Sequence, residues 1–199
     1  MTKPYKIFFF VIIAMITLRF AELKLNAPNY MKAYMDLGQK NAAQTNYPQA
    51  IKDFQKATQI NPTSALPYYQ LALIYEKLND QENKMKNFEK VVELGSTIDR
   101  MKNIPYKRRD WEFAHACYEV GTKYKNNGNL PMAIRMFELS LNHNELFTKS
   151  ACQLGLIYND INQKDKTFKY LYTLDNTNDR ESIGKLGHAM HTLHPEWWE

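Results

Sequence analysis

Few side chains in this sequence could carry out covalent chemistry. Its two cysteines, Cys117 and Cys152, form no CxxC pair and have no spacing typical of a metal site. A nucleophilic thiol needs a base and a group that orients the base, and no His and Asp set accompanies either cysteine. We therefore interpret both as buried or half-buried thiols, with a disulfide between them as the alternative. The sequence predicts that the chain is not an enzyme.

The histidines near the C-terminus could suggest a metal site. His188, His191 and His194 recur at every third residue, a spacing that drifts around a helix instead of following one face. No carboxylate stands at a matching position to complete a set of ligands. The sequence therefore predicts neither a metal nor any other cofactor.

A short basic cluster lies in the middle of the chain. Lys107, Arg108 and Arg109 follow one another between Tyr106 and Trp111. One interpretation is a long connection with solvated charge, and the other is an anionic contact, either with lipid headgroups or with an acidic partner. The remaining Lys and Arg of this chain, with net charge +5, are mostly interleaved with Asp and Glu. We therefore expect no nucleic-acid partner and no small-molecule substrate.

Residues 1–24 differ in composition from the rest of the chain. An unbroken apolar run, Ile7 to Leu18, lies between Lys6 and Arg19, and as a helix it would rise about 18 Å against roughly 30 Å of bilayer hydrocarbon. A signal-anchor over residues 5–23 with snorkelling basic ends is the preferred interpretation. It predicts a single-pass membrane protein with an extracytoplasmic remainder. The alternatives are a cleaved signal peptide, which predicts a secreted or periplasmic protein, and a buried apolar helix.

Residues 31–181 contain an internal repeat. Gly38 and Ala72 are 34 residues apart, as are Gly121 and Gly155, and 49 residues separate the two pairs. An apolar residue precedes each of these four positions, and an aromatic residue often follows three later. The second halves of the units agree as well, with members Ala50, Phe54, Phe88, Ala133, Phe137 and Leu171.

This pattern resembles the tetratricopeptide repeat, a helix-turn-helix unit of 34 residues. Four units are predicted, as two pairs over 31–98 and 114–181, with a basic insertion over 99–113 between the pairs. Some residues depart from the family pattern: Asn41 replaces the usual Tyr, Lys84 and Thr167 replace the small Ala, and Ser96, Glu145 and Asp179 replace the closing Pro.

Close helix packing explains the repeated residues. A small residue such as Gly38 or Gly121 leaves room for a bulky ring, such as Phe54 or Phe137, from the second helix of the same unit. Asn46 and Asn129 are expected in turns, and Pro48 and Pro131 at the first turn of the helix that follows.

Residues 182–199 form an amphipathic pattern, with Ile183, Leu186, Met190, Leu193 and Trp197 at intervals of three and four. Such a helix is suited to covering the last repeat. The predicted fold class is therefore all-α: a right-handed solenoid of helix-turn-helix repeats, with an N-terminal apolar helix and a C-terminal capping helix.

The resemblance implies a concave face, lined by the first helix of each unit, that binds extended peptides or partner helices. It places on this face Met35, Gln39, Tyr69, Leu73, Tyr118, Thr122, Cys152 and Leu156. Some relatives hold a C-terminal carboxylate with Lys, Asn and Arg, but the corresponding places here hold Met35, Gln39, Gln70, His115 and Glu119. Recognition of a C-terminal carboxylate at these places is therefore not expected.

The sequence thus predicts a membrane-tethered interaction module that acts as a scaffold or adaptor and binds a peptide or partner helix. The alternative is an accessory or regulatory subunit of a membrane or envelope enzyme complex. In that case the basic insertion contacts lipid headgroups or an acidic partner.

Overall fold

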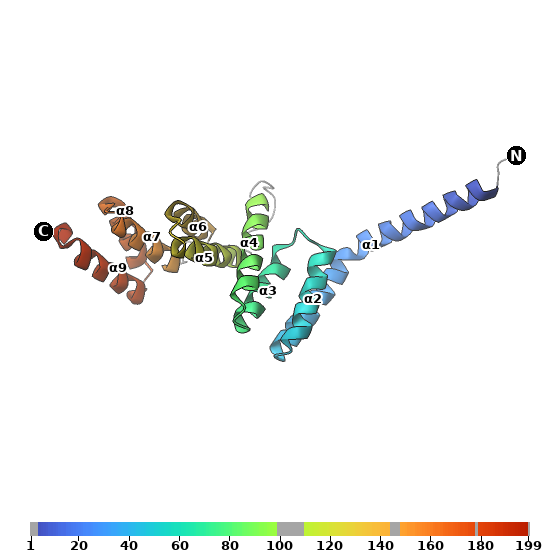
Figure 1. The fold of residues 1–199 in the computed structure, drawn as a ribbon, viewed down its shortest axis with the longest axis horizontal. Helices are drawn as coiled ribbons and strands as arrows, with labels where there is room; N and C mark the ends of the chain where they lie inside the picture. Colours follow the sequence, from blue (N-terminus) through green and yellow to red (C-terminus); the bar gives the residue numbers. More distant parts are fainter. Residues whose placement is uncertain (1–3, 99–109, 144–147, 178, 199) are drawn as a thin grey trace. The chain divides into compact units, whose positions relative to one another are not determined.

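The computed structural model describes residues 4–98, 110–143, 148–177 and 179–198, and every regular element within these ranges is helical (Figure 1). The elements are α1 (Pro4–Ala43), α2 (Tyr47–Ile60), α3 (Ala65–Lys77), α4 (Gln81–Ile98), α5 (Asp110–Asn126), α6 (Leu130–His143), α7 (Thr148–Asp160), α8 (Lys164–Asp175), α9 (Arg180–Leu193) and the 3₁₀ helix η1 (Pro195–Trp198). The all-α prediction is confirmed. The basic cluster Lys107–Arg109 lies outside the described residues.

The turn inside each helix pair has the same backbone geometry in all four repeats. Left-handed φ angles occur at Thr45 (58°), Asn79 (56°), Gly128 (74°) and Asn162 (57°), and each lies seven residues after the small residue that marks its repeat. The residue after each of them donates its backbone N–H to a carbonyl five positions earlier, at 2.8 to 2.9 Å. This bond satisfies a carbonyl that the helix end would leave unpaired. The same turn therefore recurs at the place that the predicted repeat register gives it.

The next helix of each pair begins directly after that turn. Asn46, Asp80 and Asn129 accept a hydrogen bond from the backbone N–H three residues later, at 3.4, 3.0 and 3.3 Å. These are N-caps, which satisfy a donor that the first helical turn cannot pair. Gln163, at the corresponding place before α8, makes no such bond. Pro48 lies in the first turn of α2 and Pro131 in that of α6, as predicted.

The chain divides into two compact units, Met1–Ile74 and Tyr75–Glu199. In the first unit, a Cβ added to Gly38 would lie 2.6 Å from Cε1 of Phe54, so the predicted pairing of small residue and ring is present. Asn41, which departs from the family pattern, donates from Nδ2 to Oδ2 of the buried Asp53 at 2.7 Å. The departure therefore has a local reason, because a buried carboxylate needs a donor.

In the second unit, a Cβ on Gly121 would lie 2.9 Å from Cε1 of Phe137. Gly155 differs, because the atoms nearest to its would-be Cβ all belong to Leu186 of α9 and not to the second helix of its own repeat. Leu186 and Met190 are completely buried in the core that α9 shares with α7 and α8. The C-terminal helix therefore packs directly on the last repeat.

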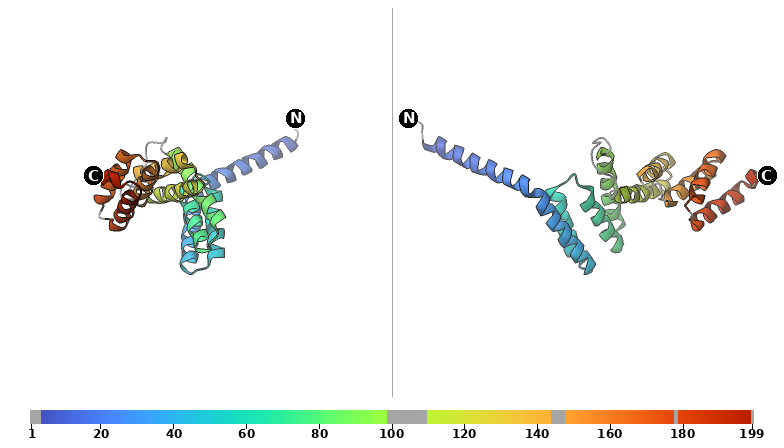
Figure 2. Two further views of the ribbon diagram at one scale, coloured as in Figure 1. Left: turned by 60° about the vertical axis from the view of Figure 1, so that its left-hand side comes forward. Right: turned by 180° about the vertical axis from the view of Figure 1, so that it is seen from behind.

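Helix α1 continues without interruption through Pro28 into the first repeat. Its second half packs on α2, whereas its first half extends away from α2 in both Figure 1 and Figure 2. Ile12, Ile13 and Met15 are exposed on this first half. These three side chains therefore do not lie in an apolar core, as a buried apolar helix would require.

The predicted membrane anchor over residues 5–23 is wrong. Within the part of the chain that the structure describes, no helix combines the length and the apolar character that a membrane crossing requires. The physical reason is that Lys6 and Arg19 bound an apolar run of about 18 Å, whereas the hydrocarbon core is roughly 30 Å thick. The extracytoplasmic placement of the repeats depended on this anchor and is withdrawn with it.

Candidate partner-binding face

One row of side chains runs along α5 in the second unit. It consists of Trp111, His115, Tyr118, Thr122 and Lys125, separated by intervals of three and four residues, which place them on the same side of the helix. Trp111 is 51% exposed, and the other four are half-buried. A large, exposed aromatic ring at one end and a lysine at the other give this side of α5 both an apolar and a cationic end.

Helix α7 adds side chains beside this row. Lys125 donates from Nζ to Oε1 of Gln153 at 2.7 Å, which connects α5 to α7. Lys149 lies one turn before Gln153 on α7, is exposed, and is close enough to His115 to act electrostatically on its ring. We call the five α5 residues together with Lys149 and Gln153 the α5/α7 face.

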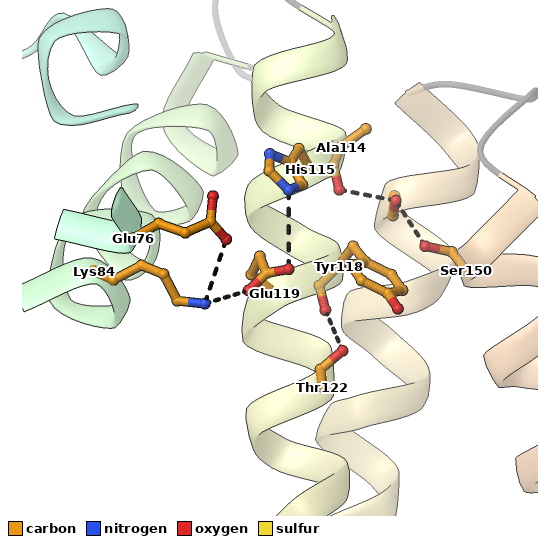
Figure 3. A network of polar contacts seen from close by, with 9 residues as sticks. Glu76, Lys84, Ala114, His115, Tyr118, Glu119, Thr122 and Ser150 are labelled. Carbon is orange, nitrogen blue, oxygen red and sulfur yellow. Dashed lines mark hydrogen bonds and ion pairs between the residues drawn. The ribbon is translucent and has the colours of Figure 1, made fainter. Parts of the chain in front are cut away.

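A buried ion pair borders this face on the side of α4 (Figure 3). Nζ of Lys84 lies 2.9 Å from Oε2 of Glu119 and 3.8 Å from Oε1 of Glu76. Lys84, which stands where the repeat family has a small Ala, is only 8% exposed. Its long apolar stem fills the space inside, while its ammonium reaches the carboxylate on the neighbouring helix.

His115 occupies a crowded place between this ion pair and Trp111. Its ring stacks on Trp111 with centroids 6.0 Å apart and meets the edge of Phe88 at 5.3 Å. Burial lowers the pKa of His115, and the nearby carboxylate of Glu119, at 3.9 Å, opposes this effect. The imidazole is therefore largely neutral at pH 7, and it supports the Trp111 ring more than it adds charge.

A short chain of buried hydroxyl groups fixes the helices behind the face. Ser150 of α7 donates to Oγ of Ser140 on α6, and Ser140 donates to the carbonyl oxygen of Ala114 on α5, both at 2.9 Å. All of these groups are buried, so each bond replaces a contact with water that folding removed. Three helices are thereby held in one relative position, and the α5/α7 face has a rigid base.

The cysteines lie in the interior. Burial raises the pKa of Cys117 to about 12 and also raises the pKa of Cys152. Cys152 makes a long contact of 3.8 Å from Sγ to the carbonyl oxygen of Ser182 on α9. Both are free thiols, and both stay protonated near pH 7, where a nucleophile would have to be a thiolate. Among the residues described, no His, Cys, Asp and Glu side chains form a group that could hold a metal ion.

Four of the residues predicted to line a concave face belong to the first unit. Met35 and Tyr69 are buried, Leu73 is half-buried and Gln39 is exposed. Their assignment to a binding surface stays a prediction. The burial of Met35 and Tyr69 means that both also contribute to the core of the protein.

The other four belong to the second unit. The structure brings Tyr118 and Thr122 together, since Oγ1 of Thr122 donates to the carbonyl oxygen of Tyr118 at 2.9 Å (Figure 3). Tyr118 also packs on Phe137, with ring centroids 5.8 Å apart. Cys152 contacts Ser182 of α9, and the half-buried Leu156 packs against the core. Their assignment to a binding surface stays a prediction.

Sequence reasoning missed five members of the face. Trp111 was assigned to the basic insertion, His115 was considered only as a position for a carboxylate ligand, and Lys125, Lys149 and Gln153 were not considered. The signal that could have found the first three is the spacing of three and four residues, continued from Tyr118 and Thr122 in both directions along α5. Lys149 and Gln153 lie on α7, so only the structure could place them beside the α5 row.

Family models of known repeats match a segment within the first half of the chain. A model described as "TPR repeat" matches residues 32–79, and one described as "Tetratricopeptide repeat" matches residues 65–94. Residues 32–94 therefore match tetratricopeptide repeats, as the sequence pattern predicts.

Three known proteins show the extent of the similarity. The Hsp70-Hsp90 organizing protein of Triticum aestivum is 33% identical over 103 residues, which cover 49% of this chain and 18% of that protein. The crystal structure of MamA matches with a TM-score of 0.62 at 18% identity, covering 86% of this chain and 87% of that one. YrrB, described as a TPR protein with an unusual peptide-binding site, matches with a TM-score of 0.54 at 15% identity, covering 82% and 86%. The two solved structures establish the same repeat fold.

Proposed function

We propose that this protein is an interaction module that binds an extended peptide segment of a partner protein on the α5/α7 face. The observation that carries the proposal is the row on α5, in which an exposed Trp111 is followed by half-buried polar and aromatic side chains at helical spacing. Exposed aromatic side chains with a fixed orientation are the typical anchors of protein interfaces.

The surroundings of the row support this proposal. Stacking on His115 restricts the Trp111 ring before any partner arrives, so binding would lose little side-chain entropy. Thr122, Lys125 and Gln153 provide polar groups along the same line, which an extended peptide backbone could meet. The repeat architecture also agrees, because stacked repeats of this kind offer long surfaces for extended partners.

A peptide library tests the proposal. The full chain is probed with an array of random peptides, and the best binders are measured by fluorescence anisotropy against the parent and Trp111→Ala. Truncating an anchor of this kind costs about 2 kcal/mol, so we expect affinity to fall about 30-fold.

Tyr172 offers a matched control, since it is an aromatic residue of α8 that is 69% exposed. Tyr172→Ala should keep the affinity of the parent, and both variants should keep its helical circular dichroism. If the selected peptides bind Trp111→Ala as tightly as they bind the parent, the binding surface lies elsewhere and the proposal fails.

A further inference from the structure

Within the described part of the chain, the lysines around the α5/α7 face have no acidic partner. Among the described residues, neither Lys149 on α7 nor Lys185 on α9 makes an ion pair, and both are exposed. Lys125 donates to the neutral amide of Gln153. The three are near one another: Lys149 lies one turn before Cys152, Lys185 lies one turn after the Ser182 that contacts Cys152, and the charges of Lys125 and Lys185 both act on that thiol.

Three carboxylates on the opposite border are already engaged. Glu119 and Glu76 both contact Lys84, at 2.9 and 3.8 Å, and Glu89 pairs with Lys123 at 2.6 Å. These acidic groups belong to the side of α3, α4 and the adjoining part of α5. The positive charge on the side of α7 and α9 is therefore not cancelled by them.

One further carboxylate lies near the lysines. Asp179 precedes α9, and it accepts from the hydroxyl of Thr148 at 2.6 Å and from the backbone N–H of Ser182 at 3.1 Å. Its charge is used to cap α9 and to connect it to α7. Glu181, one turn before Lys185 on α9, is a second carboxylate on this side. Among the described residues, three lysines against these two carboxylates leave this side of the face positive.

We propose that the partner segment bound on the α5/α7 face is acidic, with side-chain carboxylates that meet Lys125, Lys149 and Lys185 and an apolar side chain that packs on Trp111. This inference rests on the proposed function and specifies the chemistry of the ligand. Charge complementarity across an interface selects partners and speeds their association. Trp111 lies at one end of the α5 row and Lys125 at the other. The apolar and acidic side chains of the peptide therefore bind at opposite ends, which fixes the orientation of the peptide.

Side-chain carboxylates are the source we favour over a C-terminal carboxylate. A terminal carboxylate is usually held by a converging set of cationic and amide groups. The positions that hold it in relatives are occupied in this unit by His115, whose ring stacks on Trp111 and meets Phe88 edge-on, and by Glu119, which is bound to Lys84. The three lysines instead lie on three different helices, a spread that suits several carboxylates along a segment.

Designed peptides test the acid preference with the full chain. Three fluorescein-labelled peptides of equal length and with amidated C-termini alternate Leu with Glu, with Gln or with Lys, and a fourth is the Gln peptide with a free C-terminus. We expect the Glu peptide to bind at least ~10-fold more tightly than the other three at about 50 mM salt, and to lose most of this advantage at about 300 mM. A preference for the free C-terminus over the Glu peptide would assign the lysines to a terminal carboxylate and overturn the inference.

Matched pairs of substitutions localise the effect. Lys149→Gln with Lys185→Gln should weaken the Glu peptide about 10-fold, whereas Lys164→Gln with Lys169→Gln, which removes the same charge from exposed positions on α8, should change its affinity less than about 2-fold. Equal losses in the two pairs would mean that only net charge matters, and the inference would fail.

The failures of the two proposals are distinguishable. If the Gln or Lys peptide binds as well as the Glu peptide and Trp111→Ala weakens it, the peptide-binding face stands and the acid preference is wrong. If none of the designed peptides binds, the acid preference is also overturned, whereas the proposed function is decided by the random array.

Discussion

Lys84 of α4 donates to Glu119 of α5 across 2.9 Å, and its side chain is only 10% exposed while that of Glu119 is 18% exposed. The ion pair joins two helices on either side of the segment 99–109. Because each charge has lost most of its water, each depends on the other.

The first prediction concerns this pair. Glu119→Gln leaves the ammonium of Lys84 without its nearest carboxylate and should lower the free energy of unfolding by about 2 kcal/mol, less than for a fully buried pair because water reaches both groups. The double variant Lys84→Met, Glu119→Leu should return to within about 1 kcal/mol of the parent, since apolar side chains fill the same space. Urea unfolding of the single and double variants measures the coupling.

An exposed pair serves as the control for that measurement. Lys90 and Glu93 lie 2.9 Å apart on α4 with side chains 36% and 64% exposed, so Lys90→Met should cost less than about 1 kcal/mol. Purely additive effects of the two substitutions at Lys84 and Glu119 would show that the buried pair is not coupled.

The second prediction compares two glycines that lie within helices. Gly121→Ala would place a Cβ 2.9 Å from the completely buried ring of Phe137, and should cost about 1 to 3 kcal/mol through overpacking. Gly184→Ala in α9 meets no atom within 4 Å, and should instead stabilise by about 0.5 to 1 kcal/mol because Ala favours a helix. Thermal unfolding checks both signs. A stabilising Gly121→Ala would contradict the close approach of α5 and α6.

The third prediction uses the turn shared by the repeats. Thr45 has φ 58°, a left-handed conformation that is costly for a β-branched residue, and Asn occupies the equivalent places at 79 and 162. Thr45→Asn should therefore stabilise the protein by about 0.5 to 1 kcal/mol in urea unfolding. Thr58→Asn, inside α2, provides the comparison and should give no gain. An unchanged or lower stability for Thr45→Asn would mean that Thr45 adopts this backbone without strain.

The fourth prediction follows from the buried thiols. Burial raises the pKa of Cys117 to about 12, so almost no thiolate exists at pH 8.5, and iodoacetamide should leave Cys117 unmodified in the native protein. Peptide mass spectrometry after urea treatment should show both cysteines modified. The pKa of Cys152 is raised too, so it should also react slowly in the native state. Modification of Cys117 at the same rate with and without urea would refute its burial.

The sequence by itself determined the repeat register and the turns. The residues that mark them, such as Asn46 with Pro48 or Gly38 with Phe54, act through neighbours within one helix pair. Because these contacts are local, the same residue types recur at the repeat interval, and the sequence alone is enough to predict them. The apolar run Ile7 to Leu18 was wrongly predicted to be part of a membrane anchor, because its apolar composition was given more weight than its short length.

Only the tertiary structure decided which residues from different repeats meet. Lys84 and Glu119 are 35 positions apart on two helices, and the sequence showed each only as a departure from a pattern. Gly155 could equally have packed on the second helix of its own repeat, but Leu186 of α9 occupies that space. The physical reason is that contacts between repeats depend on how helices approach one another in three dimensions, and similar side chains at many positions could satisfy the same local pattern.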